Sequence, residues 1–224
     1  MATLAHLYRG RQSFIPVLML HPLPKCLASL DWWCAVDNFT KQFEHGRVGE
    51  NVITQWLQRH GASVTHAEHV PPYTFPGCRL YPSGYMRGPH LIHENLRLVL
   101  PDLLVFFNGG WSWVEAKHKT CFTWHRKTRQ WVTGIDLGHY QQYLHIERST
   151  GLPVYLMFYH PQAQPDLRDI GMGSPQESPV GLFGGLLSEL HLKENHTHKN
   201  HGRHGMVYWT PKAFSLHYPL ETVQ

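Results

Sequence analysis

The stretch PDLLVFFNGGWSWVEAKHKT, residues 101–120, has the pattern of a hydrophobic β-hairpin. Leu103–Phe107 and Trp111–Ala116 are predicted strands because both are rich in aliphatic and aromatic residues. The Asn-Gly pair between them is the strongest short-range signal for a tight hairpin turn. The stretch therefore predicts two antiparallel strands inside a sheet.

Three charged side chains interrupt this hydrophobic pattern: Asp102, Glu115 and Lys117. Because side chains alternate along a strand, we expect Glu115 and Lys117 on one face and Val114 and Ala116 in a core on the other. Asp102 begins the partner strand after a proline, so it is expected beside Glu115 at the end of the sheet. Two carboxylates this close raise each other's pKa unless a cation lies between them.

A divalent metal ion between the two carboxylates would resolve this repulsion. Mg²⁺ or Mn²⁺ suits the pattern, because such ions take one or two carboxylates and let water and substrate phosphate complete the shell. The lysine would orient or deprotonate the attacking water, or neutralise charge on the phosphate in the transition state. The combination indicates metal-assisted phosphodiester hydrolysis.

Pro101-Asp102, twelve intervening residues and then Glu115-Ala116-Lys117 resemble the PD-(D/E)xK nuclease superfamily, over roughly residues 43–160. Glu115 is also the only acidic residue in the chain with a lysine two positions later. The resemblance implies a restriction-endonuclease-like α/β fold with a mixed central β-sheet flanked by helices. It also implies a Mg²⁺-dependent nuclease that hydrolyses DNA, in which Asp102 and Glu115 bind metal and Lys117 assists the nucleophile.

The same resemblance implies two supporting positions. A glutamate on the helix before the hairpin often joins the metal site in this superfamily, and Glu50 holds that place here, with Glu44 as the alternative. A polar residue on the helix after the motif often supports catalysis, and Gln141 or Gln142 is available. The sequence does not fit the Gln-x-x-x-Tyr pattern of the RecB-like branch.

The rest of the chain supplies helix and strand patterns around the hairpin. Residues 66–90 and 161–185 are rich in proline and glycine and are predicted loops. A strand, helix and strand in succession imply a partly parallel sheet. The predicted elements are a helix within 43–64 that ends at Gly61, a strand that begins at 62–65, a hairpin from 120–125 to 131–135, a helix from the N-cap Asp136 to Gly151, and strands at 152–159 and 205–209.

Length and composition predict one folded domain. The chain has 224 residues, of which 42% are hydrophobic and only 16% charged, which excludes a disordered protein. We expect a nuclease domain over residues 41–224 and an N-terminal extension over 1–40, to which no structure is assigned. Four scattered cysteines favour a reduced, cytoplasmic protein, and no apolar run is long enough to span a membrane. A homodimer is possible, since many nucleases of this fold pair to cut two strands.

A basic segment follows the motif and contains Lys119, Arg126, Lys127 and Arg129. No acidic residue occurs between Glu115 and Asp136. Such a run is often only a solvated face. Beside a site for phosphodiesters it is also suited to contact the nucleic-acid backbone, and its tryptophans either belong to the core or stack on bases.

A histidine-rich segment near the C-terminus allows a different interpretation. It contains no cysteine and many polar residues, which favours a flexible loop over a zinc site. Two alternatives to the nuclease therefore stay open: a non-catalytic nucleic-acid-binding protein that retains the nuclease fold, and a histidine-rich zinc-binding interaction protein. The histidines concerned are His191, His196, His198, His201 and His204.

Overall fold

The computed structural model describes residues 30–70, 85–87, 89–93, 96–201 and 204–223. The contacts within the chain divide it into two units between Phe39 and Thr40. Helix α1, Leu30–Arg59, spans this division. It begins well before the helix predicted from residue 43, inside the segment to which the sequence assigned no structure. Residues 30–45 contain neither proline nor glycine, so nothing in their backbone stops the helix.

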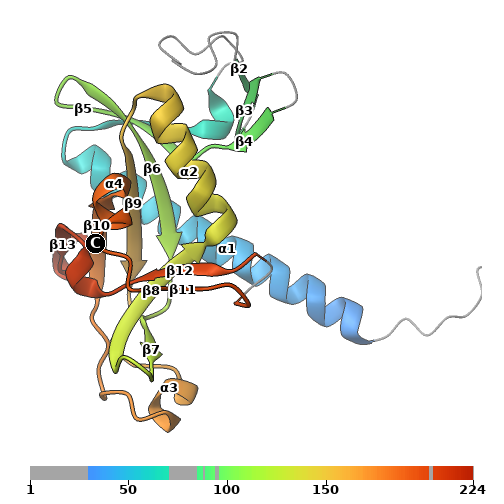
Figure 1. The fold of residues 1–224 in the computed structure, drawn as a ribbon, viewed down its shortest axis with the longest axis vertical. Helices are drawn as coiled ribbons and strands as arrows, with labels where there is room; N and C mark the ends of the chain where they lie inside the picture. The colour runs from blue at the N-terminus through green and yellow to red at the C-terminus, as the bar shows by residue number, and fades with distance from the viewer. Residues whose placement is uncertain (1–29, 71–84, 88, 94–95, 202–203, 224) are drawn as a thin grey trace, which may run out of the picture. The chain divides into compact units, whose positions relative to one another are not determined.

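The second unit, from Thr40 onward, contains a mixed central sheet of six strands in the order β1-β5-β6-β9-β10-β13 (Figure 1). β6 and β9 are parallel, and the other neighbours are antiparallel. Helices flank this sheet, so the expected α/β class with a mixed central sheet is confirmed. The strands are β1 Ser63–His66, β5 Leu103–Phe107, β6 Gly110–His118, β9 Val154–His160, β10 Gly181–Leu186 and β13 Leu216–Tyr218.

The predicted hairpin is formed by β5 and β6. Leu103 pairs with Val114, and Phe107 pairs with Gly110. The turn residues Asn108 and Gly109 both have positive φ, 49° and 80°. Two successive residues with positive φ are typical of a type I′ turn, whose twist matches that of the flanking strands. Asn-Gly adopts this turn readily.

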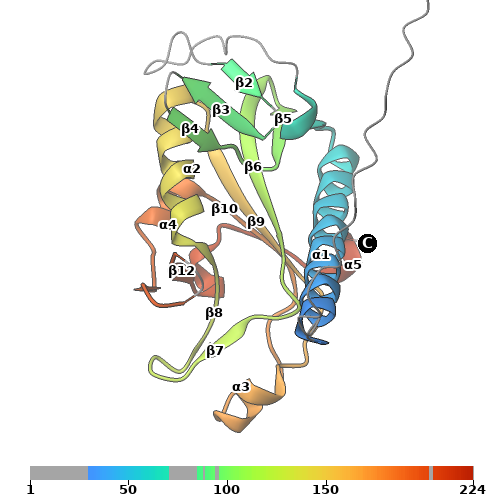
Figure 2. The same cartoon turned by 90° about the vertical axis from the view of Figure 1, so that its right-hand side faces the viewer.

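The two faces of the central sheet carry separate cores, and Figure 2 shows helices on both sides of the sheet. On one face, Trp113 packs with Tyr143 and Ile146 of α2, Leu137–Thr150, and with α4, Leu187–His191. On the other face, Val114 and Ala116 pack with residues of α1 and of α5, Leu220–Val223. The alternation predicted for β6 is therefore confirmed.

The helix predicted after Asp136 is also confirmed. The Asp136 carboxylate accepts hydrogen bonds from the backbone N–H groups of Gly138 and His139, at 2.8 and 3.3 Å, and so caps α2. Gly151 ends the helix in the left-handed conformation, with φ of 70°. The strand that follows, β9, begins at Val154 and pairs in parallel with β6, as a strand-helix-strand unit predicts.

Two smaller sheets complete the described part. One has the order β11-β12-β8-β7, and it includes the predicted hairpin and the predicted late strand; the other has the order β2-β3-β4. The remaining elements are β2 Tyr85–Arg87, β3 His90–His93, β4 Leu96–Val99, β7 Thr123–His125, β8 Gln130–Asp136, β11 His196–His198, β12 Met206–Trp209, α3 Leu167–Gly171 and the short 3-10 helices η1 Ala67–His69 and η2 Pro211–Ala213.

Both predicted loops were partly wrong. Within residues 66–90, η1, β2 and the start of β3 are regular elements, while residues 71–84 lie outside the described part. Within 161–185 the chain forms α3 and begins β10. The glycines of β10 suggested a loop, but a Cβ at Gly185 would lie 3.0 Å from the Leu190 side chain, so the close packing of α4 on this strand requires glycine.

Among the described residues, none of the helices has the length and apolar character that crossing a membrane requires.

Candidate active site

A cavity of about 470 Å³ lies where β1, β5 and β6 meet α1 and α2. The three charged residues of the hairpin motif line it together with Glu50. The structure therefore brings these four predicted site residues to one place. The lining residues are Arg47, Glu50, Asn51, His66, Ala67, Glu68, His69, Pro89, Val99, Leu100, Asp102, Glu115, Lys117, His139 and Tyr143.

Glu115 is the most buried charged group of the cavity. It lies in the middle of β6 with only 1% of its surface exposed. Its carboxylate forms an ion pair with the Lys117 ammonium group. The same ammonium group also lies 4.0 Å from Asp102 Oδ2, so one cation serves two carboxylates. A buried carboxylate is costly unless its oxygens are paired, so this site has capacity for a further cation.

Asp102 precedes β5 and is fixed by the neighbouring strand. Its Oδ2 atom accepts a hydrogen bond from the backbone N–H of Ala116 at 3.0 Å and lies 4.0 Å from Lys117 Nζ. Burial, followed by the negative charge of Glu115, raises the Asp102 pKa to about 7, although Lys117 and the Ala116 hydrogen bond act in the opposite direction. The repulsion between carboxylates that the sequence predicts is therefore present.

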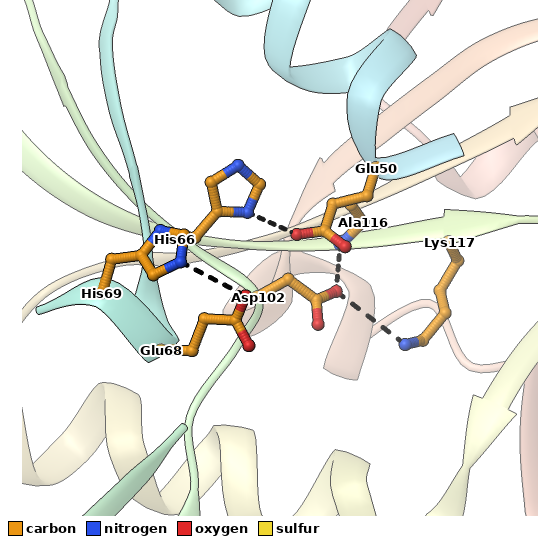
Figure 3. Close-up of polar contacts among 7 residues, drawn as sticks. All are labelled: Glu50, His66, Glu68, His69, Asp102, Ala116 and Lys117. Atoms are coloured by element: carbon orange, nitrogen blue, oxygen red, sulfur yellow. Dashed lines mark hydrogen bonds and ion pairs between the residues drawn. The ribbon is translucent and has the colours of Figure 1, made fainter. Parts of the chain in front are cut away.

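Lys117 forms ion pairs with both carboxylates, of which Figure 3 shows the one with Asp102. Burial lowers its pKa, but the charges of Glu115 and Asp102 raise it more, so the net shift is upward. In this arrangement Lys117 holds its proton. It is suited to orient water and to neutralise phosphate charge, and it is not a base.

The donor set fits a hard divalent cation held by Asp102 and Glu115. Among the described residues, no three His, Cys, Asp or Glu side chains surround a common point. One or two carboxylates are nevertheless what Mg²⁺ or Mn²⁺ typically takes from a protein. The single ammonium group shared by two carboxylates and the raised pKa of Asp102 both indicate a place that favours added positive charge.

Glu50 reaches the cavity from α1, but its carboxylate has a different partner. Its Oε1 atom lies 2.6 Å from Nδ1 of His66, the last residue of β1. Because His66 pairs with Leu103 across the sheet, it lies next to Asp102. The sequence analysis did not identify His66, since its place depends on a strand pairing that no local pattern reveals.

The other supporting residues predicted from the sequence do not line the cavity. Gln141 is exposed on α2, whereas His139 and Tyr143 of the same helix line the cavity. Gln142 accepts a hydrogen bond from the backbone N–H of Val99 at 2.8 Å. Glu44 is exposed. Positions 139 and 143 are four residues apart in a helix that begins after Asp136, so they lie on one face. The helical period would therefore have favoured them together as site residues.

The predicted basic segment forms the hairpin of β7 and β8, at the lower end of Figure 1. Arg126, Lys127 and Arg129 are exposed at its turn. Lys119 is half-buried, and burial followed by the charge of Lys117 lowers its pKa. Trp124 is buried and packs edge-to-face on Trp131, with ring centroids 5.1 Å apart, so it belongs to the core of this hairpin.

The histidine-rich segment is not entirely the loop that the sequence favoured. His196–His198 form β11 and pair with β12. His196 stacks on His125 and His198 stacks on His201, with ring centroids 4.0 and 3.9 Å apart. His191 lies 2.9 Å from Glu194. Among the described residues, no group of three or more metal-binding side chains occurs.

Comparisons with known proteins give structural likenesses but no match in sequence. No family model matches the chain, and no curated protein matches it. Among solved structures, the chain is similar to Hjc, a Holliday junction resolvase from Archaeoglobus fulgidus, an archaeal hyperthermophile. The identity is 10% and the TM-score 0.40, over 80% of this chain and 100% of that chain.

Proposed function

We propose that this protein is a nuclease that hydrolyses DNA phosphodiester bonds with Mg²⁺ or Mn²⁺, as a member of the PD-(D/E)xK superfamily. The observation that carries the proposal is the buried Glu115 carboxylate, which shares the single ammonium group of Lys117 with Asp102 in one cavity. Structural stability alone does not require this arrangement, because burying a carboxylate costs free energy.

In the proposed reaction, Asp102 and Glu115 hold the metal ion and Lys117 acts on the substrate. Bound Mg²⁺ or Mn²⁺ would supply positive charge that polarises the phosphate and lowers the pKa of water. Lys117 donates hydrogen bonds to the attacking water or to a phosphate oxygen and neutralises charge there. Glu50 is not part of the metal set that we propose, because its carboxylate contacts His66.

The basic turn of the β7-β8 hairpin is proposed to contact the DNA backbone. Arg126, Lys127 and Arg129 are exposed there, and contacts from such residues to phosphates position DNA without reading its sequence. The half-buried Lys119 lies on the chain between Lys117 and this hairpin. It is proposed to extend the same contact toward the cavity.

The proposal is tested by incubating the protein with linear, circular, branched and single-stranded DNA, in Mg²⁺, in Mn²⁺ and in EDTA. We expect metal-dependent cleavage of at least one form. The Glu115→Gln and Lys117→Met variants should each cut at least about a hundredfold more slowly, since each loses a charge that acts in the transition state. Lys212→Met, which changes a lysine outside the cavity, serves as the matched control.

Three results would contradict this assignment. Binding to DNA without cleavage of any form would favour a non-catalytic nucleic-acid-binding protein. Bound zinc that persists in Glu115→Gln, with no nuclease activity, would favour the zinc-binding alternative. Cleavage by Glu115→Gln and Lys117→Met at the wild-type rate would exclude the proposed site. The expected homodimer stays a prediction, which sedimentation of the DNA-free protein measures.

A further inference from the structure

A group of stacked histidine rings lies outside the cavity, on the four-stranded sheet that includes the basic turn. Two of the rings come from distant parts of the chain: His125 of β7 stacks on His196 of β11, with ring centroids 4.0 Å apart. His196 also stacks on Tyr208 of β12, at 4.7 Å. A second pair, His198 and His201, stacks at 3.9 Å. Together these four histidines form the histidine cluster.

Further contacts attach the histidine cluster to the β7-β8 hairpin. A Cβ at Gly134 of β8 would lie 2.8 Å from Cδ1 of Tyr208, so the glycine leaves the room in which the Tyr208 ring lies against β8. His201 Nδ1 lies 2.8 Å from the Tyr208 hydroxyl oxygen. The Asn195 side chain donates a hydrogen bond to Oε1 of Gln130 in β8, at 2.9 Å. The cluster is therefore held in a defined place on the hairpin that carries the basic turn.

The surface around the histidine cluster is basic. His125 directly precedes Arg126, the first residue of the basic turn, whose side chains are exposed. Lys199, which follows β11, is exposed as well. The two segments that build this surface lie within residues 116–135 and 195–220, and neither of these ranges contains an acidic residue. The segments therefore bring positive charge to the surface and no negative charge of their own.

Two carboxylates that adjoin these segments have other partners. Glu194, just before β11, contacts Tyr140 and His191. Asp169 of α3 is buried and accepts a hydrogen bond from the backbone N–H of Trp124 at 2.9 Å. Both carboxylates therefore have partners outside the histidine cluster.

Protonation of the cluster is unfavourable in the protein alone. Burial lowers the His125 pKa, and the charges of Lys127, His198 and His201 lower it further. Burial lowers the His196 pKa to about 4, followed by the charges of the three other histidines of the cluster. Each added proton brings one more positive charge to a place that already holds several. A bound anion would offset this repulsion and favour protonation.

We propose that the histidine cluster and the basic turn form one surface that binds the phosphate backbone of DNA, and that the cluster takes up protons when DNA binds. This inference rests on the proposed nuclease function and extends its DNA contact beyond the turn. DNA fits because its phosphates supply negative charge at regular intervals to a surface with several cations. A metal ion fits less well, since no group of three or more metal-binding side chains occurs in the part of the chain that the structure describes.

Proton uptake makes the affinity for DNA depend on pH. Log affinity then rises as pH falls, with a slope equal to the number of protons that the complex takes up. Histidine is the side chain that ordinarily changes charge between about pH 5 and pH 8. Lysine and arginine stay charged over this range, so a surface that binds DNA through them alone would keep its affinity. The pH dependence of binding therefore separates the cluster from the basic turn.

The experiment measures the binding of labelled duplex and labelled single-stranded DNA at constant salt, in EDTA to prevent cleavage, from about pH 7.5 to about pH 5.5. His198→Gln/His201→Gln removes the two exposed histidines of the cluster. We expect its affinity to be within about threefold of wild type at the higher pH and at least about tenfold weaker at the lower pH. His60→Gln/His217→Gln is the matched control and should bind like wild type, because it removes two exposed histidines outside this surface, one after α1 and one in β13.

A second variant tests the same surface by a gain of affinity. His198→Lys/His201→Lys carries both charges at every pH in this range, so at about pH 7.5 it should bind DNA at least about tenfold more tightly than wild type. Calorimetry of DNA binding in two buffers with different enthalpies of ionisation counts the protons taken up, and both double variants should take up fewer than wild type. Cleavage at saturating DNA should keep the wild-type rate, since no histidine of the cluster lines the cavity.

The outcomes separate this inference from the proposed function. If wild type neither binds nor cleaves any form of DNA, both fail. If wild type cleaves DNA, but its affinity changes with pH no more than that of His198→Gln/His201→Gln, the nuclease stands and the histidine cluster is not a DNA contact. An equal loss of affinity at the lower pH in the control variant would also overturn the inference, because the net charge of the protein would then explain the pH dependence.

Discussion

Asp102 accepts a hydrogen bond from the backbone N–H of Ala116 at 3.0 Å, which ties the residue before β5 to the strand segment between Glu115 and Lys117. A single contact therefore fixes the spacing of all three charged groups. It also holds two carboxylates near each other in a partly buried place, where the charge of Lys117 offsets their repulsion. The properties of the site follow from this arrangement.

The first prediction concerns Asp102→Asn and pH. A carboxyl group whose pKa is raised in the folded protein contributes stability that is present below its unfolded value and is lost as pH rises through its folded value. For Asp102 that window runs from about 3.8 to about 7. Relative to Asp102→Asn, wild type should therefore lose free energy of unfolding between pH 4 and pH 7. Urea denaturation at several pH values, without metal, measures the difference.

The same series includes an internal check. Mg²⁺ should restore stability to wild type above pH 7, because ligands that bind the folded state alone stabilise it, and it should have much less effect on Asp102→Asn. If the difference in free energy of unfolding between the two proteins does not change with pH, burial and the charge of Glu115 do not raise the pKa of Asp102.

The second prediction concerns the approach of α1 to β6. A Cβ at Gly49 would lie 2.3 Å from Cβ and 3.0 Å from Cα of His118, so Gly49→Ala must push α1 away. We expect a fall of about 1–3 kcal/mol in the free energy of unfolding, as is typical of overpacking. Because Glu50 is the next residue, the Glu50–His66 contact should weaken as well. Denaturant unfolding measures the stability.

Gly46 offers a matched control on the same helix. A Cβ there would meet nothing within 4 Å. Gly46→Ala should therefore stabilise the protein by about 0.5–1 kcal/mol, since alanine loses less backbone entropy in a helix. If both alanine variants have the same effect, the close approach at Gly49 is not what positions α1.

The third prediction concerns His160 at the end of β9. The ring is fully buried and stacks on Phe122. Burial, followed by the charge of Lys119, lowers its pKa to about 3. A lowered histidine pKa gives stability that is present above about pH 6.5 and is lost as pH falls toward about 3.

At pH 5 this effect amounts to about 2 kcal/mol relative to neutral pH, by the conversion of about 1.4 kcal/mol per pH unit. His160→Leu should remove that part of the acid sensitivity, whereas His69→Gln at the exposed rim of the cavity should keep it. Thermal or urea unfolding between pH 4 and pH 7.5 measures both. Equal acid sensitivity in wild type and His160→Leu would show that the ring is protonated in the folded protein.

The local signals in the sequence predicted the hairpin and α2 because their causes are local. Asn108-Gly109 sets the turn, and Asp136 and Gly151 cap the helix through contacts with its own backbone. By contrast, the strand β10 has glycines that α4 requires, and this requirement depends on a contact across the fold. His66 was missed for the same reason, since only the pairing of β1 with β5 brings it to Asp102.

The fourth prediction concerns the basic turn. Replacing Arg126, Lys127 and Arg129 together by alanine should weaken DNA binding and reduce the slope of log affinity against log salt by about 0.9 for each phosphate that is no longer neutralised. The triple variant of Arg148, Arg168 and Lys212, all outside this turn, removes the same charge and is the control. Binding at several salt concentrations, in EDTA, measures the slope. Equal slopes for the two triple variants would show that DNA affinity depends on the net charge of the protein and not on the basic turn.

The most direct test of the central claim uses the two Pro-Asp pairs of the chain, 101–102 and 165–166. Asp166 is exposed and caps α3, a role that asparagine also fills. The measurement is the rate of Mg²⁺-dependent DNA cleavage by wild type, Asp102→Asn and Asp166→Asn. We predict that Asp166→Asn cuts like wild type and that Asp102→Asn is slower by at least about a hundredfold. Equal rates for all three proteins would contradict the account.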